Sequence, residues 1–245
     1  MNRPYVLTIA GHDPSGGAGL NADIKSFEQN LVQGFSVCSA LTVQDENIFK
    51  AVNWVDHQLI LEQLNTLLDR YPIKYAKVGL IESFDVLYKT LITLNQSGVK
   101  VIWDPILSSS SGFNFHDEID EIEKIIRLCF LVTPNREEII TLSGKEIPED
   151  GAKKLSTYSN ILLKGGHAKS HANDLIFTKR AITKEFFGEQ FKGFSKHGTG
   201  CVLSAVITAN LALGYSLTDA CSEAKKYVER FIISNNSRLG NHFDI

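Results

Sequence analysis

Short apolar runs rich in β-branched residues recur along this chain, and segments with helical spacing separate most of them. The runs occupy residues 5–10, 35–43, 75–80, 99–103, 129–133 and 160–164. Such runs are typical of buried strands, and repeated strand–helix units favour a mainly parallel sheet with helices on both faces. We therefore expect an α/β fold whose ligands bind beyond the carboxyl ends of the strands.

Further segments complete this pattern. Residues 20–31 and residues 202–213 are expected to be helical, and the second of these segments is small and apolar. After Ser216, apolar residues recur at every third or fourth position and predict one amphipathic helix, with a stripe of Leu217, Ala220, Cys221, Ala224, Val228, Phe231 and Ile232. Residues 173–179 and 181–187 predict a hairpin, which would be a late antiparallel addition to the sheet.

The composition is that of a globular protein. Of the 245 residues, 43% are hydrophobic and 22% are charged, which is enough apolar sequence for a substantial core. No low-complexity linker or fixed-period repeat divides the chain, so we expect residues 1–245 to form a single domain. The net charge of -3 gives no general attraction for polyanions. Small-molecule partners are therefore favoured over nucleic acid.

The cysteines and the apolar runs bear on the location of the protein. Cys38, Cys129, Cys201 and Cys221 lie far apart without a Cys-x-x-Cys spacing, which argues against a disulfide framework and a zinc knuckle. The first residues begin a strand-like run and do not have the pattern of a secretory signal. No apolar stretch approaches the roughly 18 residues of a membrane span. We therefore expect a cytoplasmic protein with no membrane partner.

The first candidate site is a glycine-rich loop at residues 11–19, which read Gly-His-Asp-Pro-Ser-Gly-Gly-Ala-Gly. It follows the first predicted strand and precedes a predicted helix, so its glycines would let the backbone approach a ligand beside free helix-start amides. It is neither a Walker A motif nor a Gly-x-Gly-x-x-Gly fingerprint. The alternative interpretation is a tight strand-to-helix turn.

The second candidate is the segment His197-Gly198-Thr199-Gly200-Cys201, which leads into the predicted helix at residues 202–213. Amides at the positive end of a helix are suited to hold a phosphate. Cys201 would lie in the first turn, where the same field would lower the pKa of its thiol and favour a thiolate. The alternative is a small buried cysteine in a closely packed helix.

Polar residues also follow three of the later strands, and a parallel sheet would bring them to the same edge as the two glycine loops. Asp104 and Glu138 are carboxylates that could serve magnesium at a phosphate site. Lys164 could neutralise phosphate oxygens, although it could equally be an ordinary solvated lysine. The alternative for Asn135 is a helix N-cap, and for Glu137 and Glu138 stabilisation of the helix dipole.

These motifs, in this order, resemble those of the hydroxymethylpyrimidine/phosphomethylpyrimidine kinases along nearly the entire chain. The matching segments are residues 10–19, residues 40–44 (Ala-Leu-Thr-Val-Gln), Asp104-Pro105, Thr133-Pro134-Asn135 with Glu138, Lys164-Gly165-Gly166-His167 and residues 197–201. The resemblance implies the ribokinase-like superfamily and its three-layer α/β/α sandwich with a mainly parallel central sheet.

The family resemblance also implies an activity. It is the ATP-dependent phosphorylation of 4-amino-5-hydroxymethyl-2-methylpyrimidine and then of its monophosphate, in thiamin biosynthesis. ATP and Mg2+ would be the cofactors, and the protein would be a homodimer. Cys201 stands where sugar kinases and typical pyridoxal kinases carry an aspartate base. A thiol could suffice there, because phosphoryl transfer depends more on positioning and charge neutralisation than on full deprotonation of the alcohol.

Further roles are implied position by position. The pyrimidine would contact Gly11, Ala18, Asp23, Gln44 and Leu80, with Gln44 reading its polar edge. The ATP phosphates would contact Asn135, Lys164 and the turn formed by Gly198, Thr199 and Gly200. Asp104 and Glu138 would organise magnesium. Three positions depart from the family pattern, since His12, Val43 and Leu80 stand where serine, alanine and methionine are usual.

Two other functions fit parts of the same sequence. A pyridoxal kinase would also act on a hydroxymethyl group of a flat heteroaromatic ring, although Gln44 and Cys201 favour the pyrimidine. A catalytically silent pyrimidine-binding protein would keep Gln44 and the first glycine loop but lose the phosphate site. The presence of Lys164, Asn135 and residues 198–201 favours an active kinase over that protein.

Overall fold

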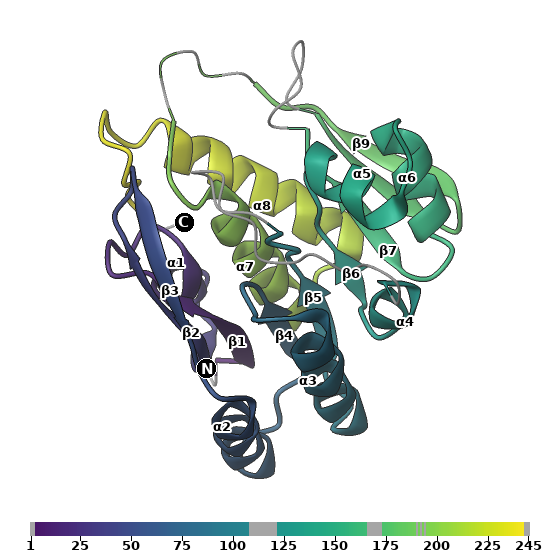
Figure 1. Cartoon of the computed structure of the whole chain (residues 1–245). Helices are drawn as coiled ribbons and strands as arrows, with labels where there is room; N and C mark the ends of the chain where they lie inside the picture. The colour runs from purple at the N-terminus through teal and green to yellow at the C-terminus, as the bar shows by residue number, and fades with distance from the viewer. Residues whose placement is uncertain are drawn as a thin grey trace.

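A computed structural model describes residues 3–107, 122–165, 173–189, 191, 193 and 195–242 (Figure 1). The strands in this part of the chain are β1 (Tyr5–His12), β2 (Gln33–Gln44), β3 (Phe49–Trp54), β4 (Tyr75–Val78), β5 (Lys100–Trp103), β6 (Leu131–Val132), β7 (Asn160–Leu163), β8 (Asp174–Thr178) and β9 (Ala181–Phe186). The helices are α1 (Gly19–Gln29), α2 (His57–Arg70), α3 (Phe84–Gln96), α4 (Ile122–Arg127), α5 (Arg136–Ser143), α6 (Pro148–Leu155), α7 (Thr199–Ala212) and α8 (Leu217–Ile232). Gly166 and His167 of the predicted lysine–glycine motif lie outside the described residues.

All of these strands form one sheet, in the order β3-β2-β1-β4-β5-β6-β7-β8-β9. The six strands from β2 to β7 in this order are parallel, and β3, β8 and β9 are antiparallel additions at the two edges. β1 pairs with β2 on one side and with β4 on the other, so the winding direction changes there. Ligands of open α/β sheets bind at such a switch point.

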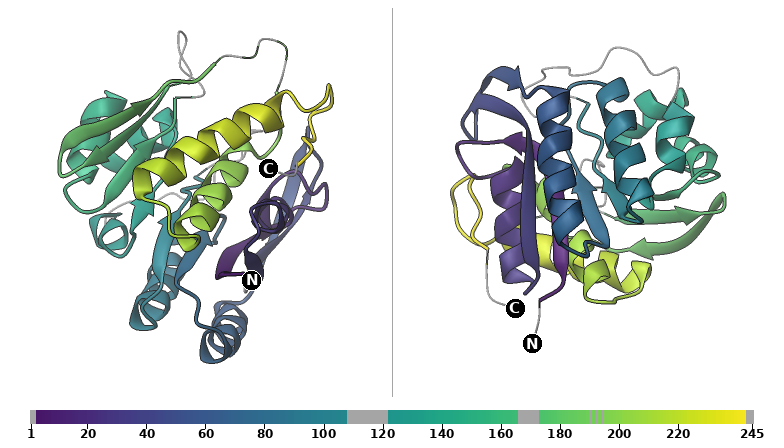
Figure 2. Two further views of the ribbon diagram at one scale, coloured as in Figure 1. Left: turned by 180° about the vertical axis from the view of Figure 1, so that it is seen from behind. Right: turned by 90° about the horizontal axis from the view of Figure 1, so that it is seen from below.

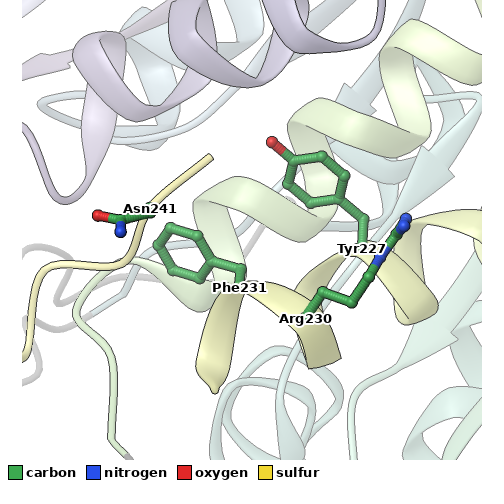
Figure 3. A pocket seen from close by; sticks show the side chains of 4 residues that line it. All are labelled: Tyr227, Arg230, Phe231 and Asn241. Carbon is green, nitrogen blue, oxygen red and sulfur yellow. The ribbon is translucent and has the colours of Figure 1, made fainter. Parts of the chain in front are cut away.

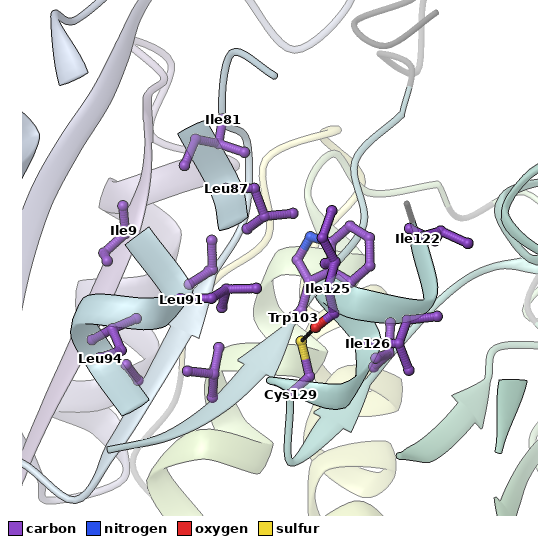
Figure 4. Packing of buried hydrophobic residues seen from close by; sticks show 14 of the residues in the cluster. Ile9, Ile81, Leu87, Leu91, Leu94, Trp103, Ile122, Ile125, Ile126 and Cys129 are labelled. Carbon is purple, nitrogen blue, oxygen red and sulfur yellow. Dashed lines mark hydrogen bonds between the residues drawn. The ribbon is translucent and has the colours of Figure 1, made fainter. Parts of the chain in front are cut away.

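Helices cover both faces of the sheet, which confirms the expected α/β/α sandwich. On one face, α7 lies between α1 and α8, and Figure 2 shows α7 and α8 across this face in the view from behind. The opposite face carries α2 to α6 and the larger apolar core. Figure 4 shows part of that core, where Leu87, Leu91 and Leu94 of α3 pack near Ile9 of β1 and Trp103 of β5.

The helix α7 owes its central position to its residue types. Its side chains from Cys201 to Leu211 are all buried, and most of them are small or β-branched. Small side chains let the backbones of neighbouring elements approach closely, so this helix can pack against α1, α8 and the sheet at once. The predicted stripe of α8 is also confirmed, because Ala220, Cys221, Ala224 and Phe231 are buried against α7.

One strand of the fold, β3, was not predicted from the sequence. It is an edge strand whose side chains are at least partly exposed, so its sequence lacks the apolar run of a buried strand. Helix α2 lies between two of the predicted runs and begins after its N-cap Asp56, whose carboxylate accepts a hydrogen bond from the Gln58 amide. The antiparallel hairpin of β8 and β9 lies where it was predicted.

Two further expectations concern location. Within the described part of the chain, no helix combines the length and the apolar character that a membrane crossing needs. Cys38, Cys129, Cys201 and Cys221 are all free thiols.

Candidate active site

The segments after the parallel strands lie at one edge of the sheet, which we call the rim. The rim comprises the residues immediately after β1, β4, β5, β6 and β7, together with the amino terminus of α7. It holds most of the residues singled out from the sequence, because the carboxyl ends of parallel strands meet at the same edge.

The two glycine loops are in direct contact at the rim, as expected. A side chain at Gly198 would collide with the carbonyl oxygen of Gly17, so the start of α7 packs directly on the backbone of the first loop. Gly19 shows the same closeness, because a Cβ there would overlap the Gly11 carbonyl and its φ of +57° disfavours other residues. Gly198 therefore lets the two loops approach each other, and Gly19 lets the first loop close on the end of β1.

The amino terminus of α7 has the features of an anion site. Its N-cap is Gly198, with a φ of 77° and no side chain that could cap the first-turn amides. Gly200 lies directly above two charged groups, since a Cβ on it would be 3.4 Å from Lys164 Nζ and 3.9 Å from Asp104 Oδ2. Helix-start amides and a lysine ammonium therefore converge at one place, which favours a bound phosphate.

A cluster of buried charges lies under these amides. Lys164 Nζ is 2.8 Å from Asp104 Oδ1 and 3.8 Å from Glu138 Oε2. Asp104 also accepts hydrogen bonds from Thr133 Oγ1 and Ser204 Oγ, each at 3.2 Å. Burial alone would raise the pKa of Asp104, but the ammonium groups of Lys164 and Lys77 hold it below its ordinary value.

The other two charges of this cluster respond differently to burial. Burial alone would lower the pKa of Lys164, but Asp104 and Glu138 keep it above its ordinary value. Burial raises the pKa of Glu138 to about 7, and the nearby Lys164 only partly offsets this. Glu138 therefore titrates near neutral pH.

Asn135 and Glu138 also have the structural role considered as the alternative. Asn135 Oδ1 accepts hydrogen bonds from the amides of Glu137 and Glu138, and Glu138 Oε2 accepts one from the Asn135 amide at 2.6 Å. These bonds form a capping box at the start of α5. The cap fixes the Glu138 carboxylate beside Lys164, so the structural role and a role at the rim are compatible.

Cys201 lies in the first turn of α7, but the expected thiolate is wrong for this structure. The side chain is buried, and burial raises the pKa of the thiol to about 11, although Lys77 and a hydrogen bond from the Gly19 amide act in the opposite direction. The helix field is thus weaker here than the loss of hydration. Cys201 is a neutral thiol at neutral pH.

Gly11, Ala18 and Leu80, which were expected to contact the pyrimidine, lie at or after the ends of β1 and β4, beside the switch point. A Cβ on Gly11 would be 2.9 Å from Leu80 Cδ2, so these two residues are in contact across β1 and β4. Ala18 is the N-cap of α1, and its amide donates to Asp13 Oδ2 at 2.9 Å. Gln44 is the last residue of β2 and is partly exposed.

Asp23, which was expected to contact the pyrimidine, lies below the rim with its carboxylate already engaged. Its side chain is fully buried on α1, with Oδ2 accepting from Thr8 Oγ1 and Oδ1 lying 2.6 Å from Lys77 Nζ. Both carboxylate oxygens are thus engaged below the rim. The Asp23 carboxylate supplies the opposite charge for a buried lysine.

Lys77 is the most prominent residue that the sequence analysis missed. It is fully buried in the middle of β4, where burial alone would lower its pKa but the Asp23 and Asp104 carboxylates keep it above its ordinary value. A lysine inside a short apolar strand was the available signal, because an unpaired buried ammonium is very costly. Ser204, which donates a hydrogen bond to Asp104, was also not predicted and carries no comparable signal.

Two hollows elsewhere do not compete with the rim. Figure 3 shows the smaller one, lined by Tyr227, Arg230, Phe231 and Asn241 at the carboxyl end of α8, and its volume of about 10 Å³ would hold no more than one water molecule. The larger one is a polar surface hollow around Lys100 and Arg127, at the edge of the sheet opposite the rim. Neither contains a residue singled out from the sequence for chemistry.

The residues of the rim fit a divalent cation only in combination with a ligand. Within the described residues, no group of three or more His, Cys, Asp or Glu side chains is arranged to hold a metal ion. Asp104 and Glu138 supply two carboxylates on either side of Lys164. This fits Mg2+, which commonly binds one or two carboxylates and takes its other ligands from phosphate and water.

The sequence matches one family over almost its full length. The family model described as phosphomethylpyrimidine kinase matches residues 13–244. A hydroxymethylpyrimidine/phosphomethylpyrimidine kinase from Rhizobium meliloti (strain 1021) is 33% identical over 239 residues, which cover 93% of this chain and 90% of that protein.

Solved structures agree with this similarity. Phosphomethylpyrimidine kinase from Clostridium difficile 630 superposes with a TM-score of 0.79 at 29% identity, covering 92% of this chain and 98% of that chain. The ADP complex of Bacillus subtilis pyridoxal kinase superposes with a TM-score of 0.83 at 27% identity, covering 94% of this chain and 92% of that chain. The fold is therefore shared with proteins named for two different acceptors.

Proposed function

This chain belongs to the phosphomethylpyrimidine kinase family, and we propose that it phosphorylates 4-amino-5-hydroxymethyl-2-methylpyrimidine and then the resulting monophosphate with ATP, as a step of thiamin biosynthesis. One observation supports this most strongly. The uncapped start of α7 lies above Lys164 and Asp104, while its N-cap Gly198 packs on the first glycine loop. A phosphoryl donor held by the amides would therefore be next to an acceptor held by that loop.

The donor phosphates are assigned to the α7 side of the rim. The amides of Gly198, Thr199 and Gly200 would donate to phosphate oxygens, and the Lys164 ammonium would neutralise them from below. Asn135 would contribute from the start of α5. The ADP complex of the similar Bacillus subtilis pyridoxal kinase makes ATP the natural donor.

Asp104 and Glu138 would hold Mg2+ together with the donor phosphates. When bound, the ion would neutralise charge on the transferring group. Both carboxylates already face the Lys164 ammonium, so their positions are fixed before any ligand binds. The contribution of this chain is thus a preorganised pair of oxygen ligands.

The acceptor is assigned to the switch-point side of the rim. Gly11, Ala18 and Leu80 would line the pyrimidine, and the partly exposed Gln44 would recognise its polar edge. Cys201 would accept the alcohol proton as a thiolate, after its thiol has released its own proton to solvent. Because the pKa of the thiol is about 11, the thiolate is a minor form at neutral pH but a strong base, and a loose transition state needs little deprotonation before the phosphoryl group has moved.

A side-by-side turnover assay tests this proposal. Purified protein would be supplied with ATP, Mg2+ and either the pyrimidine alcohol or pyridoxal, and the phosphorylated products would be separated and quantified. We expect phosphorylation of the pyrimidine alcohol and of its monophosphate with a higher kcat/KM than that for pyridoxal. If the protein consumes no ATP with either acceptor, the proposal is contradicted and a silent pyrimidine-binding protein is favoured.

A pyridoxal kinase is the second candidate function. The observation that favours it is the TM-score of 0.83 to the Bacillus subtilis pyridoxal kinase structure, slightly above the value of 0.79 for the Clostridium difficile phosphomethylpyrimidine kinase. A clear preference for pyridoxal in the turnover assay would establish this second function. The sequence family favours the pyrimidine.

We further propose that residues 1–245 act as one domain, as a homodimer in the cytoplasm. The single sheet supports one domain, and the four free thiols suit a reducing compartment. Light scattering coupled to size-exclusion chromatography tests the dimer. A mass equal to that of one chain across micromolar concentrations would contradict it.

A further inference from the structure

One buried carboxylate organises the first glycine loop. Asp13 accepts hydrogen bonds from the Ser15 amide and the Ala18 amide at 2.9 Å each, and from the Ser15 hydroxyl. Its backbone carbonyl accepts from the Gly16 amide and from Asn21 Nδ2. We call residues 13–19 the acceptor loop, because they lead to the glycine and alanine positions assigned to the acceptor.

The same carboxylate also binds a residue from the other end of the chain. His197 Nε2 lies 2.9 Å from Asp13 Oδ2, and the His197 side chain is only 9% exposed. His197 immediately precedes Gly198, the N-cap of α7. We call residues 197–200 the phosphate turn. A Cβ on Gly17 would lie 2.7 Å from His197 Cδ2, so the ring also packs on the acceptor loop.

The two segments differ in how firmly they are held without this contact. The phosphate turn has a second anchor, since the His197 amide donates to the Arg238 carbonyl at 2.8 Å and the turn continues into the buried helix α7. The acceptor loop leads into α1, and apart from a bond from Lys25 Nζ to the Gly16 carbonyl, the hydrogen bonds that shape it converge mainly on Asp13. Loss of the His197 ring would therefore loosen the acceptor loop more than the phosphate turn.

We infer that Asp13 and His197 are positioning residues, which hold the acceptor loop in register with the phosphate turn so that the acceptor alcohol meets the donor phosphate. The inference rests on the proposed function for its chemical meaning. Its physical basis is a buried, charge-assisted contact between the two segments that supply the two sides of the reaction. Neither residue needs to touch a substrate.

A pair of polar variants tests the contact without a large change in side-chain character. His197→Gln places an amide nitrogen at nearly the reach of Nε2 and should keep the hydrogen bond, whereas His197→Asn is too short for it. His57→Asn, at the start of α2, is the matched remote control. Asp13→Asn breaks the contact from the other side, and its amide cannot accept from all of the donors that converge on the carboxylate.

Hydrogen–deuterium exchange of the ligand-free protein is the first measurement. We expect the amides of residues 13–19 to exchange about tenfold faster in His197→Asn, which is typical of losing a hydrogen bond to a charged group. His197→Gln and His57→Asn should stay near the wild type. Unchanged exchange in folded His197→Asn would overturn the inference.

Steady-state kinetics is the second measurement. In His197→Asn, we expect kcat/KM for the pyrimidine alcohol to fall about tenfold or more, while KM for ATP changes less than about twofold. Adding Asp13→Asn to His197→Asn should cost less than the product of the two single effects. Equal losses for alcohol and ATP would contradict a positioning role. If the wild type phosphorylates no acceptor, the proposed function fails, and the exchange result still decides whether the contact holds the loop.

Discussion

The ammonium of Lys77 and the carboxylate of Asp23 lie 2.6 Å apart, and both side chains are completely buried. Below the rim, this ion pair joins β4 to α1, and the Thr8 hydroxyl completes it. A buried pair of this kind contributes little when both partners are present, but it leaves an uncompensated charge when one is removed. Removing one partner should therefore lower the free energy of unfolding.

Lys77→Met is expected to lower the free energy of unfolding by about 3–5 kcal/mol, because Asp23 would remain buried without its counter-charge. The double variant Lys77→Met with Asp23→Asn should recover most of this loss, since the introduced asparagine amide is neutral and can still bind Thr8. Urea unfolding monitored by circular dichroism measures both. If the double variant is no more stable than the single one, the charge explanation is wrong.

Cys201→Ala is expected to lower kcat by about 10²-fold or more, the usual scale of general acid–base catalysis. The affinity for the pyrimidine alcohol, measured by calorimetry, should change by less than about threefold, because the proposed role of Cys201 concerns only the reacting hydroxyl, and the pyrimidine ring is assigned to other residues. Near-normal turnover would remove Cys201 from the role of proton acceptor.

The raised pKa of Cys201 has its own test. Because burial raises this pKa to about 11, the thiol is protonated at neutral pH and should react slowly with iodoacetamide. Mass spectrometry of the peptide containing Cys201 would follow alkylation between pH 7 and pH 9, with the partly exposed Cys38 as the internal comparison. Rapid alkylation at pH 7 would restore the thiolate expected from the helix field.

The raised pKa of Glu138 makes the free energy of unfolding depend on pH, and the direction of this dependence can be predicted. Its pKa rises from an ordinary 4.5 to about 7 on folding, so the folded state binds the proton more tightly than the unfolded state. The stabilisation from this group is complete below about pH 4.5 and is lost as the pH rises through 7. Glu138→Gln mimics the protonated form and retains an acceptor for the Asn135 amide.

Without nucleotide, Glu138→Gln should therefore gain stability relative to the wild type on going from pH 5 to pH 8, by on the order of 2 kcal/mol. Urea unfolding at the two pH values measures the difference. A constant difference between variant and wild type across this range would show that Glu138 is ionised throughout.

Comparing Gly198→Ala with Gly144→Ala separates two costs to stability, the cost of an alanine at a positive φ and the cost of a steric collision. Alanine at a positive φ costs about 1–2 kcal/mol, and at Gly198 its Cβ would also collide with the Gly17 carbonyl. Gly144, the C-cap of α5, has a φ of 64° and no atom within 4 Å of an added Cβ, so Gly144→Ala measures the conformational cost alone. We expect Gly198→Ala to be the less stable variant and to lose turnover, while Gly144→Ala keeps it. Equal stability would mean that the loops separate easily.

Most of the architecture was predictable because apolar runs and helical spacing are local signals. The strands from β1 to β7, other than β3, and the helix stripe of α8 were found in this way. Strand β3 was missed because an edge strand has no buried run. The helix-capping role of Asn135 and the helix-start role of Glu138 were predicted as alternative interpretations, because the two residues are only three positions apart.

What could not be predicted at the site depends on burial and on long-range pairing. Asp23 was assigned to the pyrimidine by family resemblance, and its pairing with Lys77 below the rim was not predicted. The thiolate expected for Cys201 followed from the helix field, whereas the loss of water around the thiol has the larger effect. The contact of Asp13 with His197 joins residues far apart in sequence, and no local pattern predicts such a contact.

The separation of 184 residues between Asp13 and His197 also constrains when the site can exist during synthesis. Asp13 is synthesised well before its partner His197. The backbone amide of His197 in turn donates a hydrogen bond to the carbonyl of Arg238, which is synthesised later still. A growing polypeptide can thus form much of the sheet while the partner of its first loop is still absent. Under the inferred role of this contact, phosphoryl transfer would begin only after Arg238, which follows α8, has been synthesised.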